Sequence, residues 1–371
     1  MKRGYEEVVL LTGFPSFAAR KMLEELVRSG PRTFVHAVVR AKFADEAEEA
    51  LLALTFDERK RVNLIEGDAA AMDLGLSGKE YLEVAREIDR IHHVAHVSYL
   101  GAPKGVAEEV NVGGAREILE IAEVAPDLRA LVFHSTALVS GNRTGLVRED
   151  ELERGQSFKN VVEETRAHAE VLVQRRVKSL PIVVLRPTTI VGDSATGEVD
   201  RFDGPYLLVL LMLTSPPDLA LPFPGRGDAL LHLVPVDYVT RAARALGLDP
   251  RAVGRTFHLA DPSPLPARRV FELVARAGGR PAPRGFIPAN LTKAILKTPG
   301  LDRIAQSPRA FLEALATPVS YSTAGTTELL VDKGIQCPPF ETYVDKIVTY
   351  VEQRLREKRA RRDVDAPDPL V

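Results

Sequence analysis

The sequence predicts an α/β fold in which a doubly wound parallel sheet is followed by a smaller, mostly helical C-terminal region. Two observations lead to this prediction. Short apolar runs alternate with helical segments over the first half of the chain, an order that produces parallel strands joined by helices. The first unit, Val8 to Val27, passes from an apolar run through Thr12-Gly13 into a helical pattern. A strand, a glycine turn and a helix are typical of nucleotide binding, although any strand–helix unit can contain such a turn.

The composition is that of an ordinary soluble globular protein. The chain has 371 residues, 45% of them hydrophobic and 27% charged, and its net charge of -2 gives no reason to expect a nucleic-acid partner. Its single cysteine, Cys337, favours a reducing compartment, so we expect a cytoplasmic location. The apolar run Tyr206 to Leu213 is too short to cross a bilayer, and the N-terminus lacks a signal peptide's pattern. We therefore expect no transmembrane span.

The second strand, Thr33 to Val39, ends at a basic residue, Arg40. In dinucleotide-binding sheets the end of this strand faces the adenosine ribose, where an acidic residue accepts bonds from the hydroxyls and an arginine favours a 2′-phosphate. Arg40 therefore predicts NADP, with NAD as the alternative cofactor. A solvated charge at a strand end is the structural alternative.

Strands and helices continue to alternate after this point. Helices are predicted at Ala44 to Arg61 and Asn111 to Ala122, and strands at Val62 to Ile65, His92 to Val97, Leu131 to Phe133 and Ile182 to Leu185. We divide the chain into a nucleotide-binding domain (1–200), a lid or substrate insertion (201–230), a return to the first domain (231–262) and a C-terminal substrate region (263–371).

The last predicted helix, Glu341 to about Lys358, is amphipathic and ends in a basic cluster. The cluster comprises Arg354, Arg356, Lys358, Arg359, Arg361 and Arg362. Basic residues complement the carboxyl end of a helix dipole, which favours a solvated helix end. Peripheral contact with a membrane or a protein partner is the alternative.

Nine stretches, in this order, resemble the extended short-chain dehydrogenase/reductase family, in particular its fatty acyl-CoA reductase and thioester-reductase-like (male sterility, NAD-binding) branch. They are TGFPSFAA (Thr12 to Ala19), EGD (Glu66 to Asp68), NVGGAREILEIA (Asn111 to Ala122), HSTALVSG (His134 to Gly141), RPTTIVGDSATGE (Arg186 to Glu198), FDGPY (Phe202 to Tyr206), LVPVDYV (Leu233 to Val239), FHLADPSPL (Phe257 to Leu265) and QCPPFETYV (Gln336 to Val344). The resemblance implies a Rossmann fold that binds NADP or NAD.

The resemblance also implies the cofactor-binding residues. Gly13 would form the tight turn, Ser16 stands where the family's second glycine approaches the diphosphate, and Ala19 stands at the third position. Ser16 is a departure, because its side chain occupies space beside the diphosphate, although its hydroxyl could donate a hydrogen bond. The remaining residues expected at the cofactor are Thr12, Phe17, Arg40, Asp68, Arg166 and Pro187. For Asp68, an adenine contact and a purely structural turn are both open.

The catalytic residues of the resembled family are only partly present. Its members use a Ser or Thr, matched by Thr136, a proton-donating Tyr and a Lys four residues later. The last two positions are occupied by Val162 and Arg166. Valine has no transferable proton, and arginine stays protonated, so Arg166 could bind ribose hydroxyls without transferring a proton.

Another group would have to supply the proton if the protein were a reductase. Tyr99, after the fourth predicted strand, is the first candidate, and His134, His168 and Tyr206 are weaker ones. A structural role is the alternative for each.

Two functions remain open from the sequence. One is an NADP(H)-dependent oxidoreductase that reduces an acyl thioester, aldehyde or ketone with a non-standard proton donor. The other is a non-catalytic pseudoenzyme that binds a nucleotide or lipid-like ligand as a sensor or scaffold. Both imply a small, apolar acyl or carbonyl ligand, and neither implies a metal. A sugar-nucleotide epimerase would need the same missing Tyr and Lys and has no specific support.

Overall fold

The computed structural model describes residues 4–99, 101–199, 206–216, 218, 220, 222–224, 227–287 and 318–364. The chain forms two compact units. The first consists of Met1–Ile190, Val236–Pro262 and Val319–Cys337, and the second of Val191–Pro235, Ser263–Pro318 and Pro338–Val371. Residues 319–337, which the sequence-based division assigns to the C-terminal region, are therefore part of the first unit. Phe202, used in the sequence analysis, lies outside the described residues.

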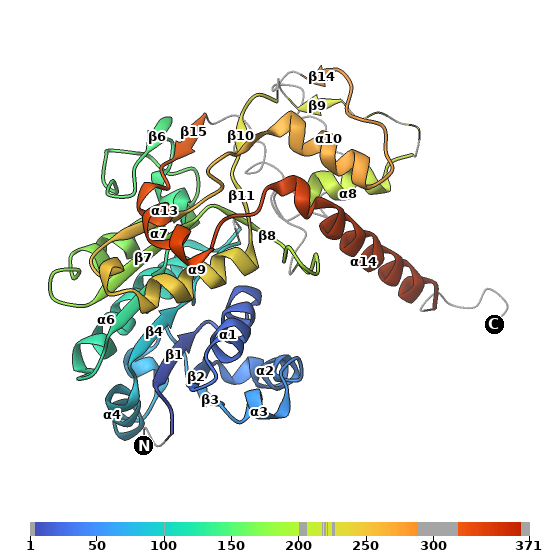
Figure 1. The fold of residues 1–371 in the computed structure, drawn as a ribbon. Coiled ribbons are helices and arrows are strands. Elements are labelled where there is room, and N and C mark those ends of the chain that lie inside the picture. The colour runs from blue at the N-terminus through green and yellow to red at the C-terminus, as the bar shows by residue number, and fades with distance from the viewer. Residues whose placement is uncertain are drawn as a thin grey trace. The chain divides into compact units, whose positions relative to one another are not determined.

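A parallel sheet of seven strands forms the centre of the first unit (Figure 1). Its order is β12-β7-β5-β4-β1-β2-β3. The strands are β1 (Glu7–Thr12), β2 (Thr33–Val39), β3 (Val62–Glu66), β4 (Arg90–His93), β5 (Ala130–His134), β7 (Ile182–Pro187) and β12 (Thr256–Leu259). Strands after β1 run toward one edge and strands after β4 toward the other, so the order reverses between β1 and β4. The predicted doubly wound parallel sheet is confirmed, and its ligand crevice is expected at this reversal.

Helices cover both faces of the sheet. On one face α1 (Phe17–Ser29) packs against α9 (Val236–Leu248), and on the other α6 (Gly114–Val124) packs against α4 (Gly78–Glu87) and α7 (Val161–Gln174). Helix α1 buries Met22, Leu23, Leu26 and Val27, the apolar positions that predicted a helix. The short elements of this unit are η1 (Ala41–Phe43), η2 (Met72–Gly75), α5 (Lys104–Ala107), the π-helical η3 (Glu108–Gly113), η4 (Ala137–Ser140), β6 (Gly145–Val147), β8 (Thr189–Val191), η5 (Pro250–Ala252), β15 (Val319–Tyr321), α13 (Ala324–Leu330) and η6 (Val331–Lys333).

Two predicted elements differ from the structure because side chains bind backbone groups. The fourth strand was expected to reach Val97 but ends at His93. Beyond His93 the backbone amides bind side chains instead of a neighbouring strand: the amide of Ala95 donates to Thr12 Oγ1 (3.2 Å), and the amide of Val97 donates to Asn111 Oδ1 (2.8 Å). The helix expected over 44–61 is divided into α2 (Ala44–Leu51) and α3 (Phe56–Arg59). A capping box formed by Thr55 and Glu58 starts the second helix.

A carboxylate joins separated segments of the first unit. Glu149 accepts hydrogen bonds from the amides of His258 (3.1 Å), Gly325 (2.7 Å) and Thr326 (3.2 Å), and from the Thr326 hydroxyl (3.0 Å). Beside it, β15 pairs in parallel with β6. These contacts attach the segment 319–337 to the strand β12 and to the loop that contains Glu149.

The second unit has its own apolar core, formed by α8 (Tyr206–Thr214), α10 (Ala267–Ala277) and α14 (Val344–Val364). Its short elements are β9 (Phe223–Pro224), β10 (Leu230–Leu231), β11 (Leu233–Pro235), β13 (Leu265–Pro266), β14 (Phe286–Ile287) and η7 (Phe340–Thr342). The apolar run expected to cover the site is the helix α8. The side chains of residues 358–364, which include most of the predicted basic cluster, lie outside the described part. Among the helices that the structure describes, none has the length and apolar composition needed to cross a bilayer.

Candidate functional site

The turn between β1 and α1 requires glycine at position 13. Gly13 has φ +87°, and a Cβ there would lie 2.7 Å from the nitrogen of Ala95. The next residues place Ser16 at the N-cap of α1, exposed to solvent. Within the described ranges its hydroxyl has no hydrogen-bond partner. The free amides of the first helical turn and the helix dipole give this end of α1 a partial positive charge beside the hydroxyl.

Thr12 holds this turn against the end of β4. Its side chain is buried, accepts from the amide of Ala95, and lies 3.0 Å from Nδ1 of His93. The His93 ring stacks on Phe133 at 5.5 Å between centroids. Burial lowers the pKa of His93 to about 3, so this imidazole is neutral at physiological pH. Thr12 therefore has a structural role: its buried side chain connects the end of β1 to the end of β4.

Arg40 and Asp68 lie side by side at the ends of β2 and β3. The Nε of Arg40 is 3.0 Å from Oδ2 of Asp68, and the two side chains are 46% and 34% exposed. Asp68 also accepts from the amide of Ala70 (3.0 Å). An exposed ion pair of this kind contributes only about 0–1 kcal/mol, so a phosphate could recruit Arg40 at small cost.

Four of the predicted site residues, Thr136, Val162, Arg166 and Pro187, line one cavity of about 120 Å³ in the first unit. Ala18, from the first turn of α1, also lines it and connects it to the glycine turn. Pockets for complete drug-sized ligands measure about 300–1,000 Å³, so this cavity suits one end of a larger ligand or a small molecule. The remaining lining residues are Val94, His96, Val97, Ser98, His134, Ser135, Leu138, Thr188, Ile190, Val236, Val239 and Thr240.

Of the proton-donor candidates, His134 lines this cavity, whereas Tyr99, His168 and Tyr206 do not. Tyr99 is half-buried and packs in a small apolar cluster with Ala102, Ala107 and Val162. His168 is exposed on α7, and Tyr206 belongs to the second unit, where its hydroxyl accepts from the amide of Gly192. Phe17 is half-buried at the start of α1.

The two histidines of the cavity are neutral. Burial, and then the charge of Arg166, lower the pKa of His134 to about 3. The pKa of His96 is lowered well below its usual value by the same two causes, and its Nδ1 donates to the carbonyl of Val94 (2.7 Å). An imidazole with such a pKa holds no second proton near pH 7 and cannot act as a general acid there. The lining hydroxyls are far weaker acids still.

Arg166 is the charged group of the cavity. Its side chain is 4% exposed, and its Nη2 donates to the carbonyl of His134 at 2.5 Å. Burial lowers its pKa to about 10, against the attraction of Glu170, so the guanidinium stays charged at pH 7. Glu170 itself binds elsewhere: its Oε1 lies 2.6 Å from Nη2 of Arg186, and its Oε2 accepts from the Ser135 hydroxyl (2.5 Å).

Sequence reasoning missed Glu170, Arg186 and Ser135 as parts of this site. Glu170 lies four residues after Arg166 on the same helix, a spacing that could have indicated an interaction. No sequence pattern predicts the contact between Glu170 and Arg186, which comes from β7. In the described part of the chain, no group of histidine, cysteine, aspartate or glutamate residues has the arrangement of a metal site.

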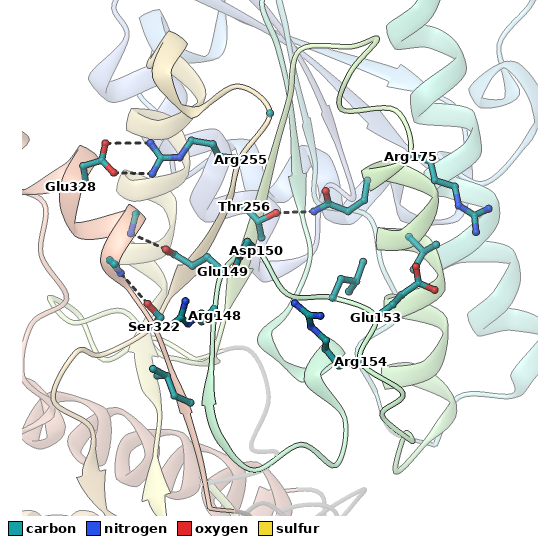
Figure 2. A pocket seen from close by; sticks show the side chains of 17 residues that line it. Arg148, Glu149, Asp150, Glu153, Arg154, Arg175, Arg255, Thr256, Ser322 and Glu328 are labelled. Carbon is teal, nitrogen blue, oxygen red and sulfur yellow. Dashed lines mark hydrogen bonds and ion pairs between the residues drawn. The ribbon is translucent and has the colours of Figure 1, made fainter.

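A larger groove, of about 1,010 Å³, lies elsewhere in the first unit (Figure 2). It shares no lining residue with the cavity and includes Gln174, at the end of α7, and Thr256, at the start of β12. It therefore lies near the amino ends of the strands, whereas ligands of doubly wound sheets bind at the carboxyl ends. Figure 2 shows Arg255 paired with Glu328 (2.9 Å) at its edge. We therefore place the candidate site in the smaller cavity.

Comparisons with known proteins identify the family to which the chain belongs. The family described as "Male sterility protein" matches residues 11–243. The glycine betaine reductase ATRR of Emericella nidulans is 27% identical over 285 residues, which cover 72% of this chain and 22% of that protein. The fatty acyl-CoA reductase wat of Drosophila melanogaster is 25% identical over 281 residues, covering 65% and 54%. The chain thus spans about a fifth to a half of these curated relatives.

A solved structure matches nearly the whole chain. The crystal structure of the terminal R domain from the myxalamid PKS-NRPS biosynthetic pathway has a TM-score of 0.80 and 26% sequence identity. The match covers 95% of this chain and 92% of that domain.

Proposed function

Because the chain belongs to the male sterility protein family, an NAD(P)-binding branch of the extended short-chain dehydrogenases/reductases, we propose that it is a pseudoenzyme that binds NADP(H) and a small acyl or carbonyl ligand. The resemblance seen in the sequence is confirmed at the level of family and fold. The cofactor preference, the ligand and the loss of catalysis are the proposal.

The observation that carries the proposal is the environment of Val162. This residue is buried in the wall of the cavity, at the position of the family's proton-donating tyrosine. Around it, His96 and His134 are neutral and Arg166 is a permanent cation at pH 7. General acid catalysis accelerates a reaction by about a hundred- to ten-thousand-fold, so a cavity without an acid should turn over very slowly.

The cofactor part of the proposal is supported by the glycine turn and by Arg40. Because Gly13 has no Cβ, the turn can approach the backbone of Ala95 closely. The Ser16 hydroxyl at the start of α1 is free to donate a hydrogen bond to a diphosphate oxygen. Arg40, beside Asp68 at the ribose end, would bind the 2′-phosphate of NADP. Arg166 and Pro187, at the other end, would lie against the nicotinamide half. When bound, the cofactor supplies or accepts a hydride.

The ligand class follows from the relatives and from the cavity. A glycine betaine reductase and a fatty acyl-CoA reductase both act on a carbon at the oxidation level of a carboxyl group. The cavity presents the Thr136 hydroxyl among valines and isoleucine, which suits an oxygen attached to an apolar chain.

A slow reductase that uses Tyr99 is the second candidate. The observation in its favour is that Tyr99 packs in the same small apolar cluster as Val162. Rotation of its side chain could bring a phenol toward the position that Val162 occupies.

The decisive experiment combines binding with gain of function. We would titrate the protein with NADPH and NADH, and then assay NADPH oxidation with acyl-CoAs, aldehydes and ketones. We expect NADPH to bind, turnover no higher than in Thr136→Ala, and a gain of at least a hundredfold in the double variant Val162→Tyr/Arg166→Lys. Wild-type turnover at an ordinary rate, about 1 s⁻¹ or more, would refute the pseudoenzyme, and its loss in Tyr99→Phe would identify the substitute acid.

A further inference from the structure

We propose that the cavity is a carboxylate-binding site in which Arg166 holds the anionic group of a short-chain monocarboxylic acid. This deepens the proposed function, on which it rests only in placing the small ligand in the same cavity. It names a ligand at the acid level, which cannot be reduced without prior activation, rather than a thioester or aldehyde.

The first support is the incomplete pairing of Arg166. A guanidinium has five N–H donors. Among the described residues, Arg166 makes one hydrogen bond, to the carbonyl of His134, and no carboxylate lies within ion-pair distance of it. The side chain is 96% buried and still lines the cavity. The guanidinium therefore has unused donors in a residue that borders the space where a ligand would lie.

The second support is the balance of buried charge. Glu170 is the anion whose charge attracts Arg166, but Arg186 and Ser135 occupy its oxygens. The neighbouring imidazoles, His96 and His134, are neutral. The cluster of Arg166, Arg186 and Glu170 thus has one positive charge more than it has negative ones. A buried charge without a counterion is costly, so an anion that enters the cavity gains this missing interaction.

The third support is the composition of the remaining wall. Thr136 Oγ1 accepts from the amide of Leu138 (3.2 Å), which leaves its O–H free to donate to the same anion. Apart from these donors, the two neutral histidines and the hydroxyl side chains of Ser98, Ser135, Thr188 and Thr240, the wall is apolar, with Val94, Val97, Val162, Ile190 and Val236. A carboxylate attached to a short alkyl chain matches both the hydrogen-bond donors and the apolar side chains of this wall. The volume of about 120 Å³ excludes a long chain from the enclosed part of the cavity.

The experiment compares isosteric ligands on the full chain. Calorimetry would measure butyrate against butyramide and butylammonium, at equal ionic strength and without cofactor. We expect butyrate to bind at least tenfold more tightly than the amide, and the ammonium not to bind. Arg166→Met should abolish this preference and Arg166→Lys should retain part of it. Arg175→Met, which removes an exposed arginine at the end of α7, is the matched control and should behave like the wild type.

The proposal is overturned if butyrate binds no more tightly than butyramide to the wild type, or if the preference persists in Arg166→Met. If Arg166→Met does not fold, contacts between the alkyl protons of bound butyrate and the Val162 methyl groups, measured by NMR on the wild type, decide the question. Their absence refutes the site. An NADPH titration of the same samples separates the two proposals. If NADPH binds and butyrate does not, only the carboxylate site is refuted. If butyrate binds and NADPH does not, only the proposed cofactor binding is refuted.

Discussion

Replacing Glu170 by alanine should destabilise the first unit more than any exposed charge substitution. Glu170 and Arg186 are 0% and 1% exposed, and the carboxylate receives both Nε and Nη2 of the arginine in addition to the Ser135 hydroxyl. Removing it leaves Arg186 and Arg166 as two buried cations with no anion between them. Truncation of one partner of a buried pair costs about 3–5 kcal/mol, because the other charge stays desolvated.

The size of this effect can be measured by urea and thermal unfolding. About 1 kcal/mol lowers the melting temperature of a unit of 150–250 residues by about 2–4 °C, so Glu170→Ala should lower it by roughly 6–20 °C. Glu328→Ala removes an exposed partner of Arg255 and serves as the control, with an expected loss below about 1 kcal/mol. Adding Arg186→Met to Glu170→Ala should recover part of the loss. A loss in Glu170→Ala as small as that of the control would refute the argument from buried charge.

Three further predictions follow from the cofactor end and from the buried histidines. Arg40→Glu should weaken NADPH binding by about ten- to a hundredfold, which corresponds to the loss of one charge-assisted hydrogen bond, and should leave NADH binding nearly unchanged. Fluorescence titrations would measure both affinities. An equal loss for the two cofactors would contradict the role assigned to Arg40. Gly13→Ala should abolish cofactor binding and cost at least about 1 kcal/mol of stability, because of its positive φ and the approach to Ala95; unchanged NADPH affinity and urea midpoint would contradict this. The folded-state pKa values of His93 and His134 lie at about 3, below the unfolded value of 6.5, so the unfolded chain binds more protons between these pH values. Stability should therefore fall as the pH is lowered from 6.5 toward 3, by up to about 1.4 kcal/mol per pH unit for each histidine, and equal unfolding free energies at pH 7 and pH 5 would count against neutral buried imidazoles.

The sheet could be predicted from the sequence because its physical signal is local. Strands such as the segment Ile182–Leu185 are apolar throughout, as is typical of strands covered on both faces, and the helices between the strands favour parallel pairing. The end of β4 could not be predicted, because it depends on two side chains, Thr12 and Asn111, that bind its backbone from distant parts of the chain.

The candidate site also has features that could be predicted from the sequence and features that could not. The replacement of tyrosine and lysine by Val162 and Arg166 is visible in the sequence, and the structure places both in one cavity with Thr136. The pairing of Glu170 is not visible. Its spacing from Arg166 favours a contact within α7, yet the carboxylate binds Arg186, which belongs to the separate strand β7. Charge balance in a buried site is a property of the assembled fold.

The hydrogen bonds of Glu149 have a consequence for the order of synthesis. Three of its four donors come from Gly325 and Thr326, whereas the seven-stranded sheet is complete by residue 259. A nascent chain that has emerged only that far has every strand of the sheet but no partners for this carboxylate on that side. The first unit can therefore acquire its final stability only after the ribosome has passed through most of the second. Ribosome-bound chains truncated before and after residue 326 should consequently differ in their resistance to proteolysis.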